Sequence, residues 1–493
     1  MAVVDCDPHK ENLGLDPLPD IDFNIRCGNT LVGYANEHEL EVANYNEDMF
    51  TVQDFRDKVA EEMEKISLAY KRYRDIQLNQ QKEERIEDFK QSKDELQRRL
   101  STLNTLLNKR LHSAKPNILS LENWTIQTRP FHWIAEFYEI IHNGGFDVII
   151  GNPPYVEYSK VKDYTLGKEY KTLPCGNLYA FVIERSWSII NTNAKFGMIV
   201  PLSLSCGERM SSLRKLFLEK SDNNYFSNYE IFPSKLFDGA FQRLTIFLTS
   251  NKKKNKYNEF YSTKLHRWYS VEREFLLQKL NYTRSEIVSN IQGFGKFSNN
   301  LHFEIIKSNS KYQSINCYCV KNKTAKLIYY QEATNYWMKA CARIPYYKKN
   351  GIIQEPAHGR LLYFNDGNTL KTCFAIVNSS LFYIWYITFS DGFHLSDTII
   401  KNYPFEKGLI ENHKLLELAE KLEIDIKNKS IISNRNTKSD KIELETFCMN
   451  QSKPLIDEID KVLAQHYGFT EEELDYIINY DIKYRMGDEL GEE

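Results

Sequence analysis

Short apolar runs alternate with amphipathic stretches between residues 130 and 250, and this alternation restricts the chain to few folds. The apolar run "FDVIIG" (146–151) follows one amphipathic stretch (130–145), and "KFGMIVPLSL" (195–204) follows another (177–191). Apolar strands that alternate with helices are typical of a mostly parallel sheet with helices on both faces. We therefore predict an α/β fold for this region.

A different pattern follows residue 50. Apolar side chains recur there every three or four residues, at Val59, Met63, Ile66, Tyr70 and Tyr73 and again at Leu96, Leu100, Leu103 and Leu107. This spacing places them on one narrow helical stripe with charged flanks. We predict a helical hairpin or short coiled coil over 51–112, which could be a solvated spacer or a partner-binding device.

Composition limits the classes of protein that remain. A chain of 493 residues is long enough for about three domains. Its 64 Lys and Arg nearly balance its 67 Asp and Glu, so any nucleic-acid surface must be a local patch. No secretory leader and no apolar run of about 18 residues is present, which predicts a cytoplasmic protein without a membrane partner.

Cysteine and histidine spacing favours neither disulfides nor metal. The nine cysteines are scattered, and the closest pair, Cys317 and Cys319, lacks the CxxC spacing of a zinc site. His132, His142 and His394 also lack metal-ligand spacing. We predict reduced thiols and no metal.

The run "FDVIIG" ends abruptly in Asn152-Pro153-Pro154-Tyr155. Asn152 offers an amide oxygen, and restricted backbone angles fix the direction of the Pro153 carbonyl. Two rigid acceptors can bind both hydrogens of an exocyclic amine, while Tyr155 offers a face on which a flat ring can stack. Ligands bind at the carboxyl ends of strands in open α/β sheets, so this turn suits an amine oriented toward an incoming methyl group.

These four residues resemble the catalytic motif of adenine-N6 DNA methyltransferases. The blocks "LGLDPLPDIDFNIRCGNTLVG", "LFDGAFQRLTIFL", "NSSLFYIWYITFSDGFHLS" and "KPLIDEIDKVLAQHYGFTEEELDYIINYDIKYRMG" are similar to those of type IIG restriction–modification and BREX-type phage-defence methyltransferases, in the same order. The resemblance covers nearly the whole chain. It implies site-specific methylation of double-stranded DNA with S-adenosylmethionine as the donor.

The resemblance also implies roles for single residues in binding the target base. Asn152 and Pro153 would hold the amine of a flipped adenine, and Tyr155 would stack on its ring. Phe237, in "KLFDGAFQR", is similar to the aromatic residue that covers the other face of the base. An ordinary core position remains an alternative for Phe237.

Donor binding is implied at two further places. Gly28 and Asn29 resemble the turn near the adenine moiety of S-adenosylmethionine, although Asn29 could equally be a simple turn residue. Asn177 and Tyr179 begin a stretch, "LYAFVIER", that resembles the helix lining the cofactor pocket.

The glycine-rich donor loop of this family, DPxxGSG, precedes the strand that carries the catalytic turn. Upstream of residue 144 the glycines are Gly14, Gly28 and Gly33, and they form no GxG. We therefore expect a partial sheet whose cofactor-binding half lies on a separate polypeptide that carries the glycine-rich loop. A catalytically inactive DNA-binding remnant and a scaffold subunit of a defence complex are the alternatives.

We predict a partial Rossmann-like methyltransferase sheet with a helical insertion, followed by a mixed target-recognition domain and a helical C-terminal region. The predicted regions are an N-terminal remnant of the methyltransferase core (1–50), the helical insertion (51–129), the catalytic core (130–256), the target-recognition domain (257–405) and the C-terminal helices (406–493). The candidate phosphate contacts are Lys252, Lys253, Lys254, Lys321, Lys323, Lys348 and Lys349.

Overall fold

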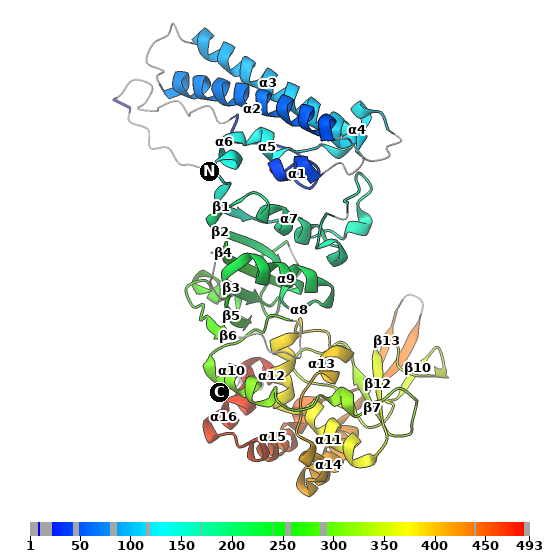
Figure 1. The fold of residues 1–493 in the computed structure, drawn as a ribbon. Coiled ribbons are helices and arrows are strands. Elements are labelled where there is room, and N and C mark those ends of the chain that lie inside the picture. The colour runs from blue at the N-terminus through cyan, green and yellow to red at the C-terminus, as the bar shows by residue number, and fades with distance from the viewer. Residues whose placement is uncertain are drawn as a thin grey trace. The chain divides into compact units, whose positions relative to one another are not determined.

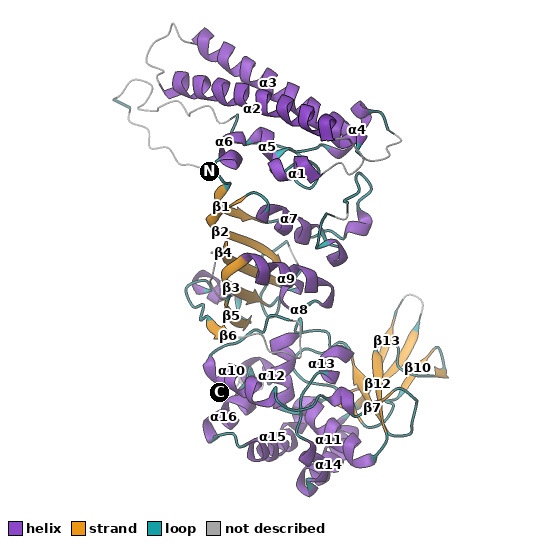
Figure 2. Ribbon diagram, viewed as in Figure 1, coloured by secondary structure: helices purple, strands orange, loops and turns teal. Residues whose placement is uncertain are grey.

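The chain forms two compact units, Met1–Phe196 and Gly197–Glu493, in the computed structural model. The structure describes residues 8–9, 22–42, 49–78, 86–114, 119–167, 169–239, 241–251, 258–285, 293–437 and 440–487. Both units combine helices and strands, as Figures 1 and 2 show. The fold is α/β with helical regions, as predicted, and its sheet is mixed.

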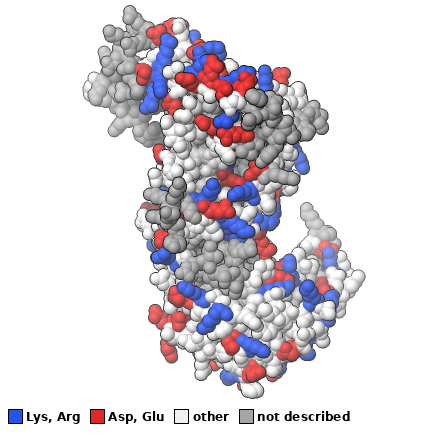
Figure 3. All heavy atoms as spheres, viewed as in Figure 1, with Lys and Arg blue, Asp and Glu red and all other residues white. Residues whose placement is uncertain are grey.

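The predicted helical hairpin is confirmed in the first unit. Helices α2 (Met49–Leu78) and α3 (Ile86–Ser113) lie side by side (Figure 1). The leucines at 96, 100, 103 and 107 are buried with Val59, Met63 and Ile66 in one apolar cluster. That cluster also contains Ile134 and Ala135, so the hairpin packs onto the rest of the unit. Lys, Arg, Asp and Glu are intermixed on its outer face (Figure 3).

Apolar and polar side chains alternate over residues 21–25, which predicts a strand, and this prediction is wrong. Residues 22–25 form turns, and Asn29 makes an isolated bridge to Pro130 before the short helix α1 (Glu37–Val42). Phe23 packs edge-on against Tyr73, with ring centroids 4.9 Å apart. This segment therefore buries its aromatic side chain against the hairpin, and pairing with a neighbouring strand is not needed for that burial.

The amphipathic stretch 130–145 is two short helices, and the single helix predicted there is wrong. After α4 (Leu121–Thr128), α5 (Trp133–Glu136) and α6 (Tyr138–His142) are separated by Phe137, whose φ of −130° leaves the helical range. The Phe137 ring packs against Phe146, 5.4 Å between centroids. Gly145 then turns the chain into β1 (Phe146–Gly151) with a φ of +106°.

Helix α7 (Leu178–Trp187) and strand β2 (Ile190–Pro201) follow as predicted. The buried guanidinium of Arg185 on α7 joins three separate segments. Its Nη1 lies 2.6 and 2.8 Å from the two Glu39 carboxylate oxygens, and its Nη2 donates to the Tyr170 hydroxyl at 2.8 Å and to the Gly33 carbonyl at 3.4 Å. Arg185 thus fixes α7 against residues 33–39 and the loop that contains Tyr170.

The sheet order is β1-β2-β4-β3-β5-β6, of which β3 to β6 belong to the second unit. The stretch "LRKLFLE" (213–219) predicts a helix, and after the short helix α8 (Ser203–Cys206) it lies within α9 (Ser211–Lys220). The strands are β3 (Ser221–Tyr229), β4 (Leu244–Asn251), β5 (Glu259–His266) and β6 (Thr283–Ser285). Strand β3 pairs antiparallel with β4 and parallel with β5, so this part is mixed and not mostly parallel.

The rest of the second unit combines two small antiparallel sheets with helices. One sheet has the order β7-β12-β8-β9 and the other β11-β10-β14-β13. Their strands are β7 (Cys319–Val320), β8 (Leu327–Gln331), β9 (Ala340–Cys341), β10 (Tyr347–Lys349), β11 (Ile352–Ile353), β12 (Gly359–Phe364), β13 (Ile431–Asn436) and β14 (Lys441–Thr446). The helices are α10 (Asn300–Asn309), α11 (Gly367–Asn378), α12 (Ser380–Phe389), α13 (Asp397–Lys401), α14 (His413–Lys429), α15 (Lys453–Tyr467), α16 (Glu471–Asn479) and α17 (Ile482–Arg485).

The C-terminal region is helical as predicted, except for the hairpin of β13 and β14. Strand β14 pairs with β10, so that Leu444 lies opposite Tyr347. Among the described residues, no single helix is long and apolar enough to cross a membrane. Helices α11 and α12 together reach that length and composition, but they are bent by 66°, and most of their residues are buried in the core.

The free energy of unfolding should depend on pH in a way that reveals the buried, neutral imidazole of His132. Its Nδ1 accepts from the Tyr34 N–H at 3.1 Å and its Nε2 lies 2.9 Å from the Asn108 amide oxygen. Burial, and secondarily the charge of Arg185, lowers its pKa from 6.5 to about 3. Because the unfolded chain takes up a proton below pH 6.5 and the folded chain does not, the stability that His132 provides is lost as the pH falls through that value.

We expect the stability advantage of the natural chain over His132→Gln to shrink by about 2 kcal/mol between pH 7 and pH 5. Denaturant unfolding at the two pH values measures it. An advantage that is equal at both pH values would contradict a buried neutral imidazole.

Arg185→Ala should strongly destabilise the first unit, because it leaves the Glu39 carboxylate and the Tyr170 hydroxyl without their shared cation. We expect a loss of about 3–5 kcal/mol in the free energy of unfolding, measured by denaturant titration. The matched control is Arg98→Ala, which removes an exposed partner of Glu95 on α3. Equal effects of the two substitutions would show that the buried pair has no special role.

Candidate active site

The turn Asn152-Pro153-Pro154-Tyr155 leaves the end of β1 at the protein surface. Asn152 and Pro154 are exposed, Pro153 is buried, and Tyr155 is half-buried. The Asn152 amide is therefore accessible to a ligand, while its proline neighbours restrict the backbone beneath it.

Tyr155 positions the Asn152 amide directly. Its hydroxyl donates a hydrogen bond to Asn152 Oδ1 at 2.8 Å. Burial raises the pKa of Tyr155 to about 12, so the hydroxyl keeps its proton at neutral pH. A carbonyl oxygen has two lone pairs, and one of those on Asn152 Oδ1 remains for a second donor. The sequence predicted a stacking role for Tyr155, and the structure adds this hydrogen bond.

The segment after the turn is tied to the first residues of α7. Leu178 N donates to the Val156 carbonyl and Tyr158 N to the Gly176 carbonyl, both at 2.9 Å. Between these bonds, the Asn177 side chain donates to Glu157 Oε1 at 3.3 Å. The catalytic turn is consequently anchored on α7, the helix that Arg185 holds in place.

Glu184 on α7 orders the far end of the same loop. Its carboxylate accepts from the backbone N–H groups of Lys171 and Thr172 at 2.9 and 2.8 Å, and from Thr172 Oγ1 at 2.7 Å. Sequence reasoning did not single out Glu184 or Arg185. Their adjacent charges within an otherwise apolar helix are the signal that could have identified them.

The Gly28-Asn29 turn is used by the fold. A Cβ added at Gly28 would lie 2.8 Å from the ring of Phe131, so glycine is needed there for close packing. Asn29 Oδ1 accepts from Leu31 N at 3.1 Å, and the Asn29 side chain also bonds that of Tyr164. These contacts agree with the alternative that Asn29 is a simple turn residue.

Asn177 and Tyr179 are also engaged within the fold. Asn177 Oδ1 caps α7 by accepting from Tyr179 N at 3.4 Å, and its amide nitrogen donates to Glu157. The Tyr179 ring is fully buried, edge-on to Tyr155. Gly28, Asn29, Asn177 and Tyr179 therefore all make contacts within the fold.

Strand β1 is the outermost of the described strands in its sheet. Val148 and Ile150 point to the same face because side chains alternate along a strand. They are 59% and 80% exposed. An outer strand with exposed apolar residues is a template for pairing with another strand.

The second unit carries exposed aromatic residues between β3 and β4. We call residues 231–239 and 241–242 the aromatic loop. Phe237, predicted from the sequence, is half-exposed, as is Phe232, and Phe241 is 68% exposed. The rings of Phe232 and Phe241 are 5.5 Å apart, and Lys235 Nζ lies 5.9 Å from the Phe241 centroid. Three phenylalanines in one short loop are a signal for ring stacking, but the sequence analysis assigned such a role to Phe237 alone.

The candidate phosphate contacts differ in their surroundings. Lys348 Nζ pairs with Glu443, and Lys349 Nζ pairs with Asp440, both at 3.0 Å. Lys321 and Lys323 are exposed next to β7. Lys252, Lys253 and Lys254 lie outside the described residues. Neighbouring carboxylates reduce the positive potential that Lys348 and Lys349 would offer to a phosphate.

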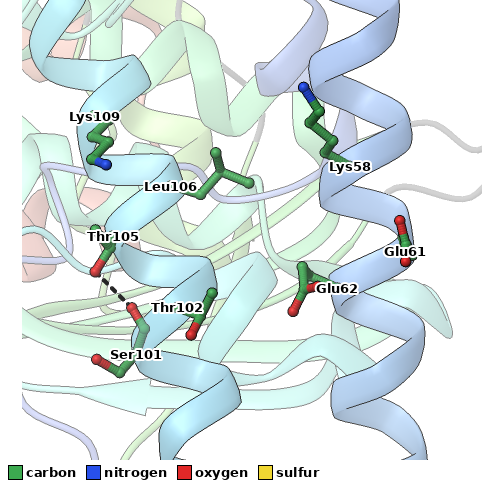
Figure 4. A pocket seen from close by; sticks show the side chains of 8 residues that line it. All are labelled: Lys58, Glu61, Glu62, Ser101, Thr102, Thr105, Leu106 and Lys109. Carbon is green, nitrogen blue, oxygen red and sulfur yellow. Dashed lines mark hydrogen bonds between the residues drawn. The ribbon is translucent and has the colours of Figure 1, made fainter.

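A groove of about 480 Å³ lies on the helical hairpin, between α2 and α3. Figure 4 shows Lys58 and Lys109 near its edge and the hydroxyl groups of α3 along one wall. Its remaining lining is Glu61, Glu62, Ser101, Thr102, Thr105 and Leu106. Charges of both signs line this open surface, so the groove selects no ligand of a particular charge.

Comparisons with known proteins find sequences similar to part of this chain. Residues 55–237 match the family model of the Eco57I restriction-modification methylase. A curated protein of Methanocaldococcus jannaschii, named as a candidate type II restriction enzyme and methyltransferase, is 25% identical over 275 residues. The match covers 48% of this chain, which spans only 22% of that protein's length.

Solved structures show weaker likenesses. A nuclease-deletion mutant of the type ISP restriction-modification enzyme LlaGI, in complex with a DNA substrate mimic, matches at a TM-score of 0.33 and 9% identity, over 71% of this chain and 51% of that one. The type IIG restriction endonuclease BpuSI matches at 0.25 and 9%, over 77% and 59%. Likenesses at this level add nothing about function. The family match and the curated relative support a restriction–modification methyltransferase.

Proposed function

We propose that this protein takes part in methylation of the N6 amine of adenine in double-stranded DNA, with S-adenosylmethionine as the methyl donor, within a restriction–modification or phage-defence system. The observation that carries the proposal is the exposed Asn152 amide at the end of β1, held by the Tyr155 hydroxyl at 2.8 Å. The family match over residues 55–237 supports the reaction class.

The residues of the turn act on the amine that receives the methyl group. Asn152 Oδ1 and the Pro153 carbonyl would accept hydrogen bonds from the two hydrogens of the amine, which directs the nitrogen lone pair away from both and toward the methyl group. As the nitrogen–methyl bond forms, the donor's sulfur–methyl bond breaks, and the methylated nitrogen then releases one proton to solvent. Such a site works by orientation and needs no strong base. The half-buried ring of Tyr155 offers a stacking face, worth about 1–3 kcal/mol per base.

The target adenine must leave the duplex to reach such a turn, at a cost of a few kcal/mol. Exposed aromatic faces offset this cost when an unpaired base stacks on them. We assign a second stacking role to the aromatic loop, whose rings at 232, 237 and 241 are exposed to different degrees. In this proposal the rings of the aromatic loop contact the unpaired base and not the apolar core.

S-adenosylmethionine supplies an electrophilic methyl group when bound. Because Gly28, Asn29, Asn177 and Tyr179 are engaged within the fold, we propose that a separate polypeptide carries the donor-binding half. Addition of a strand to the free edge of β1 would bring that half beside Asn152 and cover Val148 and Ile150. The exposure of these two side chains supports this arrangement.

Asn152→Ala should abolish methylation and spare DNA binding. The substitution removes an acceptor and leaves the fold intact because Asn152 is exposed. We expect a loss of about 100-fold or more in transfer of labelled methyl groups to adenine-unmethylated genomic DNA, assayed with the complete system. Tyr155→Phe, which loses only the hydrogen bond, should lose about two- to tenfold.

Asn143→Ala is the matched control, because Asn143 is an exposed amide just upstream of β1. Binding to duplex DNA, measured by mobility shift, should be equal in all three variants. Normal methylation by Asn152→Ala would exclude catalysis at this turn and favour the scaffold.

Calorimetric titration of the isolated chain with S-adenosylmethionine should show no micromolar binding, because the four candidate residues already have partners within the fold.

Ile150→Lys should leave the melting temperature nearly unchanged, since this side chain is 80% exposed, yet should abolish methylation by the complete system. Ile126→Lys, at a similarly exposed position on α4, serves as the control. Micromolar affinity of the isolated chain would overturn the need for a second half.

A further inference from the structure

Two buried residues of opposite charge flank the aromatic loop. Glu230 directly follows β3, and Arg243 directly precedes β4. Their side chains are 0% and 13% exposed, and Arg243 Nε lies 2.5 Å from Glu230 Oε1. Because β3 and β4 are paired antiparallel up to Tyr229 and Leu244, this ion pair closes the base of the loop.

The Glu230 carboxylate has further partners. Its Oε1 accepts from the backbone N–H of Ile231 at 2.9 Å, and its Oε2 lies 3.7 Å from Nη2 of Arg267. Arg267 in turn lies near Asp481, with Nε and Oδ2 3.6 Å apart. A buried carboxylate between two guanidinium groups is stable only while both cations stay in place.

The turn at residues 392–393 covers the pair. The guanidinium of Arg243 lies 5.4 Å from the centroid of the Phe393 ring. A Cβ added at Gly392 would lie 3.1 Å from Glu230 Oε2, and Gly392 has a φ of +76°. This close approach leaves little room for Glu230 or Arg243 to adopt another conformation.

The outer part of the loop has much weaker support. Arg273 Nη2 donates to the Leu236 carbonyl at 2.7 Å, and its Nη1 lies 3.5 Å from the exposed Asp238. Exposed ion pairs of this kind contribute little to stability. Leu236 packs against Tyr229, Trp268 and Leu276, but the rings at 232, 237 and 241 are themselves exposed, and we expect their conformation to depend largely on the base of the loop.

We infer that Glu230 and Arg243 are positioning residues that hold the aromatic loop ready to stack on an unpaired base. A loop that is ordered before binding does not lose its conformational entropy at the moment of capture. The role of the rings rests on the proposed function, whereas the ordering of the loop by the ion pair is independent of it.

Hydrogen–deuterium exchange of the full chain tests the ordering. In Glu230→Gln we expect exchange within residues 231–242 to accelerate at least tenfold, together with tryptic cleavage after Lys235. Arg243→Met, which keeps the aliphatic stem, should accelerate exchange in the same residues. This variant replaces Glu230→Gln in the test if Glu230→Gln does not fold. Arg243→Lys should restore most of the protection because it keeps the charge.

The matched control is Glu445→Gln, which breaks a charged pair with Arg343 elsewhere in the same unit. It should lower the melting temperature without changing exchange in the aromatic loop. Unchanged exchange in Glu230→Gln, or an equal change in Glu445→Gln, would overturn the positioning role.

A second measurement links the loop to base capture. The probe is a duplex with one 2-aminopurine, an adenine analogue, opposite an abasic site, so that extrusion of the base is easy. The probe's fluorescence change on titration should require at least fivefold more protein with Glu230→Gln and be lost with Phe241→Ala, whereas Glu445→Gln should match the natural chain. A loosened loop with unchanged fluorescence in both of the first two variants would overturn the stacking role and leave the positioning of the loop intact.

Discussion

The guanidinium of Arg185 is the interaction on which the candidate active site depends. It is buried, it pairs with both oxygens of Glu39, and it donates to Tyr170 from the loop that follows the catalytic turn. Through it, α7 is fixed relative to segments about 150 and 15 residues away in the sequence. Leu178 N and the Gly176 carbonyl, at the start of the same helix, then bond the backbone after Tyr155, and the Asn177 side chain bonds that of Glu157. The buried guanidinium of Arg185 thus supports the accessible amide of Asn152 indirectly, through α7 and the segment that follows Tyr155.

Local patterns predicted the elements that depend on local contacts. The hairpin α2–α3, the strand β1, the helix α7 and the turn at 152–155 are each encoded within a few neighbouring residues. Strand β3 gave no such signal, because "SDNNYFSNY" is polar and its buried Asn228 is satisfied by Thr263 on β5, 35 residues later. The break at Phe137 likewise depends on Phe146, a residue outside the helical pattern.

The same distinction applies to the site. Asn152 and Tyr155 are only three residues apart, so their common chemistry was visible in one short stretch. The four residues expected to bind the donor were chosen by resemblance at separate positions, and their packing partners could not be read from the sequence. Phe131 packs beside Gly28 and Glu157 bonds Asn177, so both positions make contacts with residues that the local sequence does not reveal.

Exposed apolar side chains destabilise an isolated protein in water and promote aggregation. Ile150 on β1 and Phe241 on the aromatic loop are nevertheless exposed, and the base of the loop that carries Phe241 is closed by the ion pair of Arg243 with Glu230. A rigid base allows such a side chain to stay at the surface instead of collapsing onto the core. That arrangement suits surfaces that are covered only during function, β1 by a strand and the aromatic loop by a base.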